Sequence, residues 1–234
     1  MSRAAGHPVL DRAGAAGLVA LGWFRPGPDD GVPQHGAMRP AALLLLGNAG
    51  PDMFARFAAE RDPLVDSLDA WTRATVDRLA AECGAAAALY PFDQPALPFL
   101  SWARRARTGH VSPLGLNIHP EYGLWHAFRA ALLFERDPDL PAMAASANPC
   151  DSCRAKPCLS TCPVGAFGGE SYDVAACARH LMVPAGVDCM EQGCLARRAC
   201  PVGSAYRYGP AQMRFHMAAF RRARGFSLDP MREI

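Results

Sequence analysis

The chain lacks a long hydrophobic run. Its longest aliphatic stretch, residues 43–46 with their flanking alanines, is far shorter than the roughly 20 residues that a membrane-spanning helix needs. The first apolar stretch is interrupted by Asp11 and Arg12, which is not typical of a secretory signal, and there is no twin-arginine start. We therefore expect a cytoplasmic protein with no membrane partner.

The chain also lacks an excess of charge of one sign. Lys and Arg number 24 against 22 Asp and Glu, so the formal net charge is +2. This charge is too small for the whole protein to bind nucleic acid by bulk electrostatics. Half of the 234 residues are apolar and a fifth are charged, which is a globular composition and argues against a disordered, collagen-like or coiled-coil protein. The length suffices for one domain and a small second one.

The hydrophobic pattern predicts both helices and strands in the first part of the chain. Helices are expected over residues 9–21, 51–60, 62–83 and 99–107. Strands are expected over residues 41–46, 85–90 and 125–134, and residues 109–120 are expected to be loop-like. This mixture indicates an α/β or α+β domain over residues 1–135.

Beyond this domain the composition changes. The sequence predicts a linker over residues 136–149, a cysteine-rich domain over residues 150–209 and a basic helical tail over residues 210–234. The cysteine-rich segment is rich in Gly, Pro and Ala and has little periodic apolar pattern. A bound metal would supply the stability that such a segment cannot obtain from a core of its own.

Cysteine is the most informative residue type. Eight of the nine cysteines lie between Cys150 and Cys200. An odd number in a chain expected to be cytoplasmic speaks against a disulfide framework and favours metal ligation. The ninth, Cys83, lies apart on a predicted helix and is interpreted as an ordinary buried thiol.

The spacing of the eight cysteines favours iron–sulfur clusters. The first four follow the pattern C-x2-C-x4-C-x3-C-P between Cys150 and Cys162, and the proline after the last cysteine is typical of a ligand sent to a second cluster. The others are Cys177 and a looser C-x4-C-x5-C-P run that begins at Cys189. Eight cysteines with two Cys-Pro endings predict two [4Fe–4S] clusters. Structural zinc is the alternative, although only the closely spaced Cys150 and Cys153 fit its tightest knuckle.

The first run resembles the longer cluster-binding variant found in ferredoxin-like electron-transfer subunits of membrane oxidoreductases. In two-cluster ferredoxins the ligands cross over between the two motifs. This resemblance implies one ligand set, here named set A, of Cys150, Cys153, Cys158 and Cys200. It implies a second ligand set, set B, of Cys162, Cys177, Cys189 and Cys194.

A second resemblance concerns residues 119–134, HPEYGLWHAFRAALLF, which are similar to the HPxxGGW signature of CblC-type vitamin B12-processing chaperones. Upstream, PAALLLLGNAGPDMFARF and DPLVDSLDAWTRATVDRL resemble an early strand and helices of that family. The resemblance implies a nitroreductase/flavin-reductase-like α/β domain with a cobalamin site formed by His119, Gly123, Trp125 and Arg129. Leu124 stands where the family has a second glycine, which could change how closely the backbone approaches a corrin ring.

Epoxyqueuosine reductases and reductive dehalogenases join a similar domain to a two-cluster ferredoxin domain in the same order. YDVAACARHL around Cys177 resembles the segment of epoxyqueuosine reductases that donates a lone cysteine. Together the resemblances imply an α+β protein whose first domain is followed by a small cysteine-rich, ferredoxin-like domain. The implied function is an iron–sulfur protein that passes electrons, received from a redox protein or reductase, to a bound cobalamin for reductive cobalamin processing.

Two other functions stay open. One is a ferredoxin-type electron carrier without cobalamin, whose first domain is a degenerate scaffold that docks a redox partner. The other is a tRNA-modifying reductase, in which tail arginines touch phosphates. The tail arginines are Arg207, Arg214, Arg221, Arg222 and Arg224. A solvated helix face is the competing interpretation of these arginines. No flavin signature is present, but the implied fold often carries flavin, so flavin also stays open.

Overall fold

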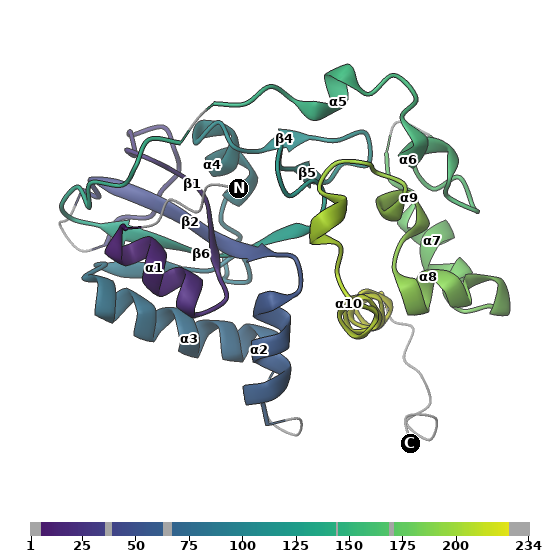
Figure 1. The fold of residues 1–234 in the computed structure, drawn as a ribbon, viewed down its shortest axis with the longest axis horizontal. Coiled ribbons are helices and arrows are strands. Elements are labelled where there is room, and N and C mark those ends of the chain that lie inside the picture. The colour runs from purple at the N-terminus through teal and green to yellow at the C-terminus, as the bar shows by residue number, and fades with distance from the viewer. Residues whose placement is uncertain (1–5, 36–38, 63–66, 144, 169–170, 225–234) are drawn as a thin grey trace. The chain divides into compact units, whose positions relative to one another are not determined.

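The computed structural model describes residues 6–35, 39–62, 67–143, 145–168 and 171–224, which form a mixed α+β structure (Figure 1). The chain divides into two compact units. Unit 1 spans residues 1–110 and 126–147, and unit 2 spans residues 111–125 and 148–234. This division differs from the predicted domains, because residues 111–125 group with the cysteine-rich segment and most of the expected linker belongs to unit 1.

Unit 1 is built on an antiparallel sheet of four strands in the order β1-β2-β6-β3. These are β1 (Val19–Phe24), β2 (Ala42–Ala49), β6 (His126–Phe134) and β3 (Ala87–Leu89). The central strand β2 is buried along its whole length, as its unbroken run of leucines predicts. Its neighbour β6 is buried from Arg129 to its end. The core of unit 1 therefore lies around these two central strands.

Helices cover both faces of this sheet. Figure 1 shows α1 (Pro8–Ala15), α2 (Asp52–Glu60) and α3 (Leu68–Cys83) on one side and α4 (Phe99–Arg105) on the other. The longest, α3, begins where the Ser67 hydroxyl accepts a hydrogen bond from Ala70 N at 3.1 Å. It ends at Gly84, whose φ of 67° is left-handed. The predicted end of this helix is thus confirmed, while residues 63–66 of the prediction lie outside the described residues.

The predicted helix over residues 9–21 is wrong in its second half. The helix α1 stops at Ala15, and the chain then turns through Gly17 at a φ of 78° into strand β1. A helical pattern and an edge strand are thus joined by a glycine in a conformation that other residues rarely adopt.

The predicted strand over residues 41–46 is too short. Strand β2 continues through Gly47, where its register with β6 shifts. A Cβ on Gly47 would lie 2.2 Å from the Ala127 carbonyl oxygen, so glycine permits a close approach of two strands here rather than ending one. The predicted helices over 51–60 and 99–107 and the strands over 85–90 and 125–134 are present with slightly shorter bounds.

Unit 2 consists mainly of short helices joined by loops, after a two-stranded sheet of β4 (His110–Val111) and β5 (Asn117–Ile118). Its helical segments are α5 (Pro149–Ser152), α6 (Pro157–Ser160), α7 (Val174–His180), η1 (Pro184–Gly186), α8 (Val187–Gln192), α9 (Leu195–Arg198), η2 (Ser204–Tyr206) and α10 (Pro210–Ala223). The helical tail is confirmed as α10, and residues 225–234 of that prediction lie outside the described residues. Within the described part of the chain, no helix has the length and apolar character needed to cross a membrane.

Candidate metal centre

The thiols of set A gather in unit 2, although Cys200 is far from the other three in sequence. Burial raises the pKa of the Cys150 thiol most, and the thiols of Cys200, Cys158 and Cys153 raise it further. Burial likewise raises the pKa of Cys158, with smaller effects of Cys200 and Cys153 in the same direction. Cys150 therefore interacts electrostatically with the other three thiols of this set.

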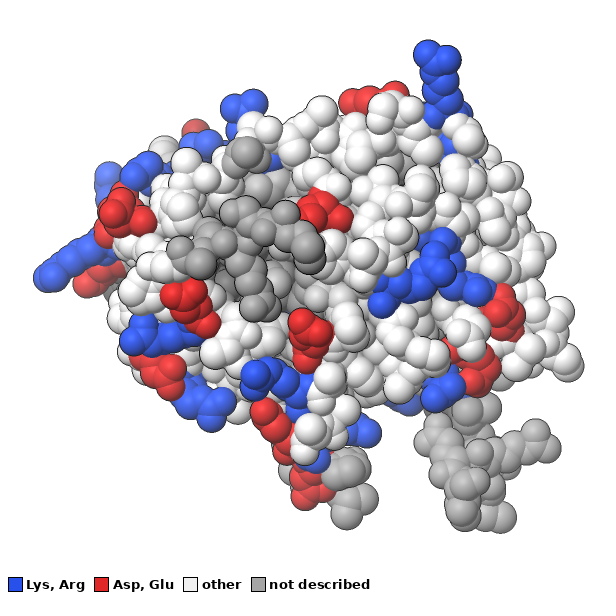
Figure 2. Space-filling model, in the orientation of Figure 1, with Lys and Arg blue, Asp and Glu red and all other residues white. Residues whose placement is uncertain are grey.

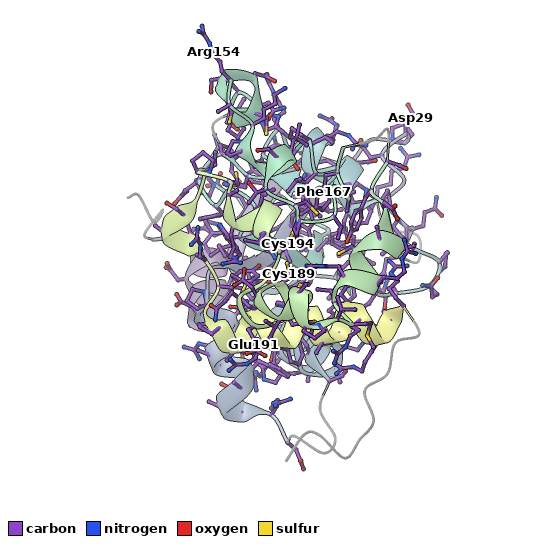
Figure 3. All side chains as sticks on the ribbon, turned by 90° about the vertical axis from the view of Figure 1, so that its right-hand side faces the viewer. Asp29, Arg154, Phe167, Cys189, Glu191 and Cys194 are labelled. Atoms are coloured by element: carbon purple, nitrogen blue, oxygen red, sulfur yellow. The ribbon has the colours of Figure 1, made fainter. Side chains whose placement is uncertain are left out.

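The thiols of set B form a second group in the same unit. Burial raises the pKa of Cys177 most, and Cys162 and Cys189 raise it further. Burial also raises the pKa of Cys194, with added effects of Cys177 and Cys162. Figure 3 shows Cys189 and Cys194 close together, and their thiols interact electrostatically.

The thiol–thiol interactions that raise these pKa values join members of the same set, and the assignment of the thiols to two ligand sets stays a prediction. Burial and mutual repulsion make thiolates costly at both places unless a cation is bound, because a metal ion deprotonates a coordinating thiol outright. The chemistry of the two groups therefore suits a strongly cationic, multi-ligand cofactor. Within the described ranges, no group of three or more His, Cys, Asp or Glu side chains is arranged to hold a single metal ion. Cys83 lies in unit 1, half-buried at the end of α3.

Hydrogen-bond donors point at several of these sulfurs. In set A, backbone N–H groups lower the pKa of Cys158 and Cys200 against the effect of burial. In set B, Ala166 N donates to Cys162 Sγ at 3.4 Å. Backbone N–H groups also lower the pKa of Cys189 and Cys194 against the effect of burial. Short helices and turns thus supply the donors that anionic ligand sulfurs need.

Tyr172 is a further neighbour of set B, and the sequence analysis did not single it out. Burial raises the pKa of the Tyr172 phenol most, and its interaction with the Cys177 thiol raises it further. The same interaction lowers the pKa of Cys177 against the effect of burial.

The predicted cobalamin contacts His119 and Gly123 lie on one tight turn of unit 2. Their backbones exchange two hydrogen bonds, of 2.9 and 2.8 Å, across an isolated β-bridge. His119 Nδ1 accepts from Glu121 N at 3.1 Å and from Tyr122 N at 3.2 Å, and the His119 ring stacks on Tyr122 at 4.4 Å. The His119 ring therefore stabilises the turn by accepting hydrogen bonds from the turn backbone and by stacking on Tyr122.

This turn packs directly on the chain that follows Cys200. Gly123 and Gly203 both have left-handed φ values, of 57° and 69°. A Cβ on Gly123 would lie 1.9 Å from the Val202 carbonyl oxygen, and a Cβ on Gly203 would lie 2.3 Å from the Tyr122 carbonyl. Only glycine fits on either side of this contact. The signature turn and the second Cys-Pro motif are therefore parts of one packed structure.

Arg197, from the short helix α9, attaches the turn to the cysteine segment a second time. Its Nε donates to the Leu124 carbonyl at 2.9 Å, and its guanidinium lies over the ring of Trp125 at 4.5 Å. Trp125 is fully buried against Tyr208, with ring centroids 5.5 Å apart. Its Nε1 finds no hydrogen-bond acceptor among the described residues.

The fourth predicted cobalamin contact belongs to the other unit. Arg129 lies on β6 in unit 1, is 9% exposed, and donates from Nε to Asn48 Oδ1 at 2.9 Å. His119, Gly123 and Trp125 thus belong to unit 2 and Arg129 to unit 1, and the shared cobalamin site of these four residues stays a prediction.

The tail arginines have partners that favour the structural interpretation over phosphate binding. Arg214 pairs with Glu191 at 3.1 Å, and Arg221 is buried. Arg207 donates to the Arg198 carbonyl at 2.8 Å, and Arg224 lies over the Phe220 ring. On the face shown in Figure 2, basic and acidic side chains are interspersed.

No protein-family model and no curated protein matches the chain. Among solved structures, the chain is similar to epoxyqueuosine reductase from Bacillus subtilis at 13% identity and a TM-score of 0.49, over 85% of this chain and 65% of that one. It is similar to the B12-trafficking protein CblC from C. elegans at 16% identity and a TM-score of 0.47, over 89% of each chain. An epoxyqueuosine reductase with an epoxyqueuosine-modified tRNA stem loop matches at 14% identity and 0.48, over 88% of this chain and 67% of that one. At these TM-scores the similarities decide neither the fold class nor the function of this chain.

Proposed function

We propose that this chain is an iron–sulfur electron-transfer protein that holds two [4Fe–4S] clusters in a ferredoxin-like unit 2. Set A would hold one cluster and set B the other. We further propose that it passes electrons to a cobalamin bound at the turn of residues 119–125. The proposal is supported by the spacing of the eight cysteines together with the electrostatic interactions between thiols of the same set.

The chemistry of each set supports a cluster. Four thiolates balance the positive charge of a cuboidal iron–sulfur core, and backbone donors to ligand sulfurs are among the factors that set its reduction potential. Most helices of the unit that carries the sets are short, and one of its apolar clusters includes thiols, so cluster binding would contribute to its folding. Two Cys-Pro endings, at Pro163 and Pro201, are better explained by two clusters than by zinc.

The packing of the signature turn supports cobalamin as the acceptor. Gly123 rests on Val202, only two residues from the set A ligand Cys200. A group held by this turn would therefore lie beside set A. The buried Trp125 Nε1, which has no acceptor among the described side chains and backbone, could donate to an amide carbonyl of the corrin periphery.

The electron balance is simple. A low-potential one-electron donor, such as a reduced redox protein, gives one electron to a cluster, which returns to its oxidised form by giving that electron to the acceptor. When bound, cobalamin would supply a cobalt centre that accepts electrons one at a time. The protein's own part is to hold the donor and acceptor groups near each other and to set their potentials through ligands, hydrogen bonds and burial.

The first test is anaerobic reconstitution of the full chain with iron and sulfide. We expect about eight iron and eight sulfide per chain, following from two four-iron clusters, with the broad visible absorption of iron–sulfur proteins. Binding of zinc in place of iron, with no acid-labile sulfide, would contradict the proposal.

The second test is a titration of hydroxocobalamin into the cluster-loaded protein, followed by visible absorption. A saturable shift of the cobalamin bands near one equivalent supports cobalamin binding. The Trp125→Phe variant keeps the ring but removes Nε1–H, so we expect its affinity to fall by about 2- to 13-fold, the equivalent of a hydrogen bond of about 0.5–1.5 kcal/mol. Trp23→Phe is the matched control, because that indole donates to Pro141 O within unit 1.

Spectra that simply add during this titration would leave an iron–sulfur electron carrier without cobalamin. In that case the acceptor is another redox protein. Binding of a tRNA anticodon stem loop that weakens steeply with salt would instead support the tRNA-modifying alternative.

A further inference from the structure

An exposed apolar loop joins two of the helices that carry cysteines of set B. Helix α7 carries Cys177, helix α8 carries Cys189, and residues 181–186 connect the two helices (Figure 1). Five exposed apolar residues on this loop and at the start of α8 are here named the apolar loop patch: Met182, Val183, Pro184, Ala185 and Val187. Val183 is 49% exposed and Val187 is 60% exposed. Single exposed apolar residues are common, whereas a contiguous group of them is typical of an interaction site.

The backbone holds the loop in a defined conformation. Met182 N donates to the Arg179 carbonyl at 3.1 Å. Further along the loop, Gly186 N donates to the Val183 carbonyl at 2.9 Å. A Cβ on Gly186 would lie 2.0 Å from the His180 carbonyl oxygen, so the loop packs closely on the end of α7. The patch is therefore formed in advance, and a partner that binds it does not have to order the loop first.

The size of the patch favours a transient partner. A stable interface of standard size takes about 20–30 residues from each partner, whereas weak electron-transfer complexes bury the smallest areas. The five side chains of the patch, even with a rim of polar neighbours, suit the second kind of complex better than a permanent dimer.

The charges beside the patch indicate the sign of the partner. Asp188, next to Val187, forms an ion pair with Arg198. Arg179, in the last turn of α7, is exposed and forms no ion pair with a described residue. The uncompensated charge among these three residues is therefore positive, which is complementary to an acidic surface.

We propose that the apolar loop patch is the docking surface for a small acidic redox protein that reduces the set B cluster. This inference rests on the proposed function, because it presupposes a cluster held by set B. One electron passes from the reduced partner to the oxidised cluster, so the partner is oxidised and the cluster is reduced by one electron. No bond forms or breaks and no proton moves.

The test uses a reduced, acidic plant-type [2Fe–2S] ferredoxin, which is a low-potential one-electron donor. It is mixed anaerobically with the oxidised, cluster-loaded full chain, and its reoxidation is followed by stopped-flow absorption. Val187→Asp and Val187→Lys each place a charge within the patch. Because a charge that is buried without a partner destabilises a complex, we expect both variants to lower the bimolecular rate constant about tenfold. Arg179→Glu should also lower it, and more strongly at low salt.

Two controls separate docking from other effects. Val111 is also a largely exposed valine of unit 2, at 59%, but it lies on β4 and outside the patch. Val111→Asp and Val111→Lys should therefore leave the rate constant unchanged. Dithionite needs no docking surface, so it should reduce the clusters of all these variants at the rate of the unaltered chain.

The outcomes distinguish this inference from the proposed function. If the unaltered chain binds no cluster, the proposed function itself is wrong. If clusters load but the ferredoxin does not reduce them, or reduces the Val187 variants as fast as the unaltered chain, only the docking surface is wrong. Opposite effects of Val187→Asp and Val187→Lys would also overturn an apolar contact, and equal slowing with dithionite would show a change in the cluster instead.

Other occupants of the patch would also overturn the proposal. A dimer of the unaltered chain that Val187→Asp converts to a monomer in analytical ultracentrifugation would identify a second copy. Binding to phosphatidylglycerol vesicles that the same substitution abolishes would identify a membrane surface.

Discussion

Unit 1 and unit 2 differ in the residues that can stabilise their folds. In unit 1 the two central strands carry an unbroken apolar core, with Leu44 and Leu132 at 0% exposure. In unit 2 several helices have only four residues, and its apolar clusters include thiols such as Cys158 and Cys200. Helices of this length are not stable alone in water. Aliphatic burial explains the stability of unit 1, and we expect unit 2 to depend in addition on a group bound by its cysteines.

Removal of iron should produce the largest difference between the units. When iron is chelated from the reconstituted protein under anaerobic conditions, we expect unit 2 to lose its hydrogen-exchange protection while the amides of β2 and β6 stay protected. The reason is that the proposed cluster–thiolate bonds would add to the stability that the apolar clusters of unit 2 provide. Hydrogen exchange read by mass spectrometry measures both regions at once. Equal protection of both units after chelation would show that unit 2 folds without metal.

The next largest effect should come from single ligands. Cys153→Ser removes one member of set A, so the iron content should fall from about eight to about four per chain while the set B cluster is retained. Cys83→Ser is the matched control, because that thiol lies in unit 1 and should not change the iron content. Unchanged iron in Cys153→Ser would mean that the assignment of ligands is wrong.

A substitution that leaves a cavity beside the sheet should lower the stability of unit 1 alone. Leu44→Ala is expected to lower its free energy of unfolding by about 2–5 kcal/mol, because it deletes buried methyl groups from the central strand. Urea denaturation measures the loss, and the iron content should stay the same. Leu100→Ala, at a position that is 50% exposed, is the control and should change stability by less than about 0.5 kcal/mol. A comparable loss in both variants would remove the special role of β2.

Two Gly→Ala substitutions in unit 2, with a smaller expected effect, should distinguish the cost of a steric clash from the cost of a left-handed backbone conformation. Gly123→Ala and Gly115→Ala both place a Cβ on a left-handed residue, which costs about 1–2 kcal/mol. Only Gly123 has backbone in the way, since nothing lies within 4 Å of a Cβ on Gly115. We expect Gly123→Ala to be about 1–3 kcal/mol worse, measured as cluster retention in urea. Equal effects of the two substitutions would mean that the turn and the second Cys-Pro motif are not packed as described.

Local pattern was sufficient for much of unit 1. The leucine run predicted a buried strand, and Gly84 was predicted to end α3. The errors occurred at glycines, because a glycine can either separate two elements or permit a close contact inside one element. Gly17 separates a helix from a strand within one apolar stretch, and Gly47 allows close strand contact inside β2. Neither use can be read from periodicity, because each depends on which backbone comes to lie nearby.

The cysteine spacing determined more about unit 2 than its apolar pattern did. The predicted ligands are cysteines at short intervals, so they could be identified without knowledge of the fold. Their division into two ligand sets and their binding of iron stay predictions. Tyr172 was missed, although its closeness to Cys177 in the sequence is a local feature that could have identified it.

The sequence alone was enough to single out the eight cysteines, the turn of residues 119–125 and the alternation of helix and strand, because each is a matter of residue type and short spacing. Only the tertiary structure decided that this turn belongs with the cysteine segment, that Gly123 rests on Val202, and that Arg129 lies in the other unit. Gly123 and Val202 are in contact although they are about 80 positions apart in the sequence. Trp125 and Arg129 are near neighbours in the sequence but belong to different units. The separation of two residues in the sequence does not show whether they are in contact in the folded protein.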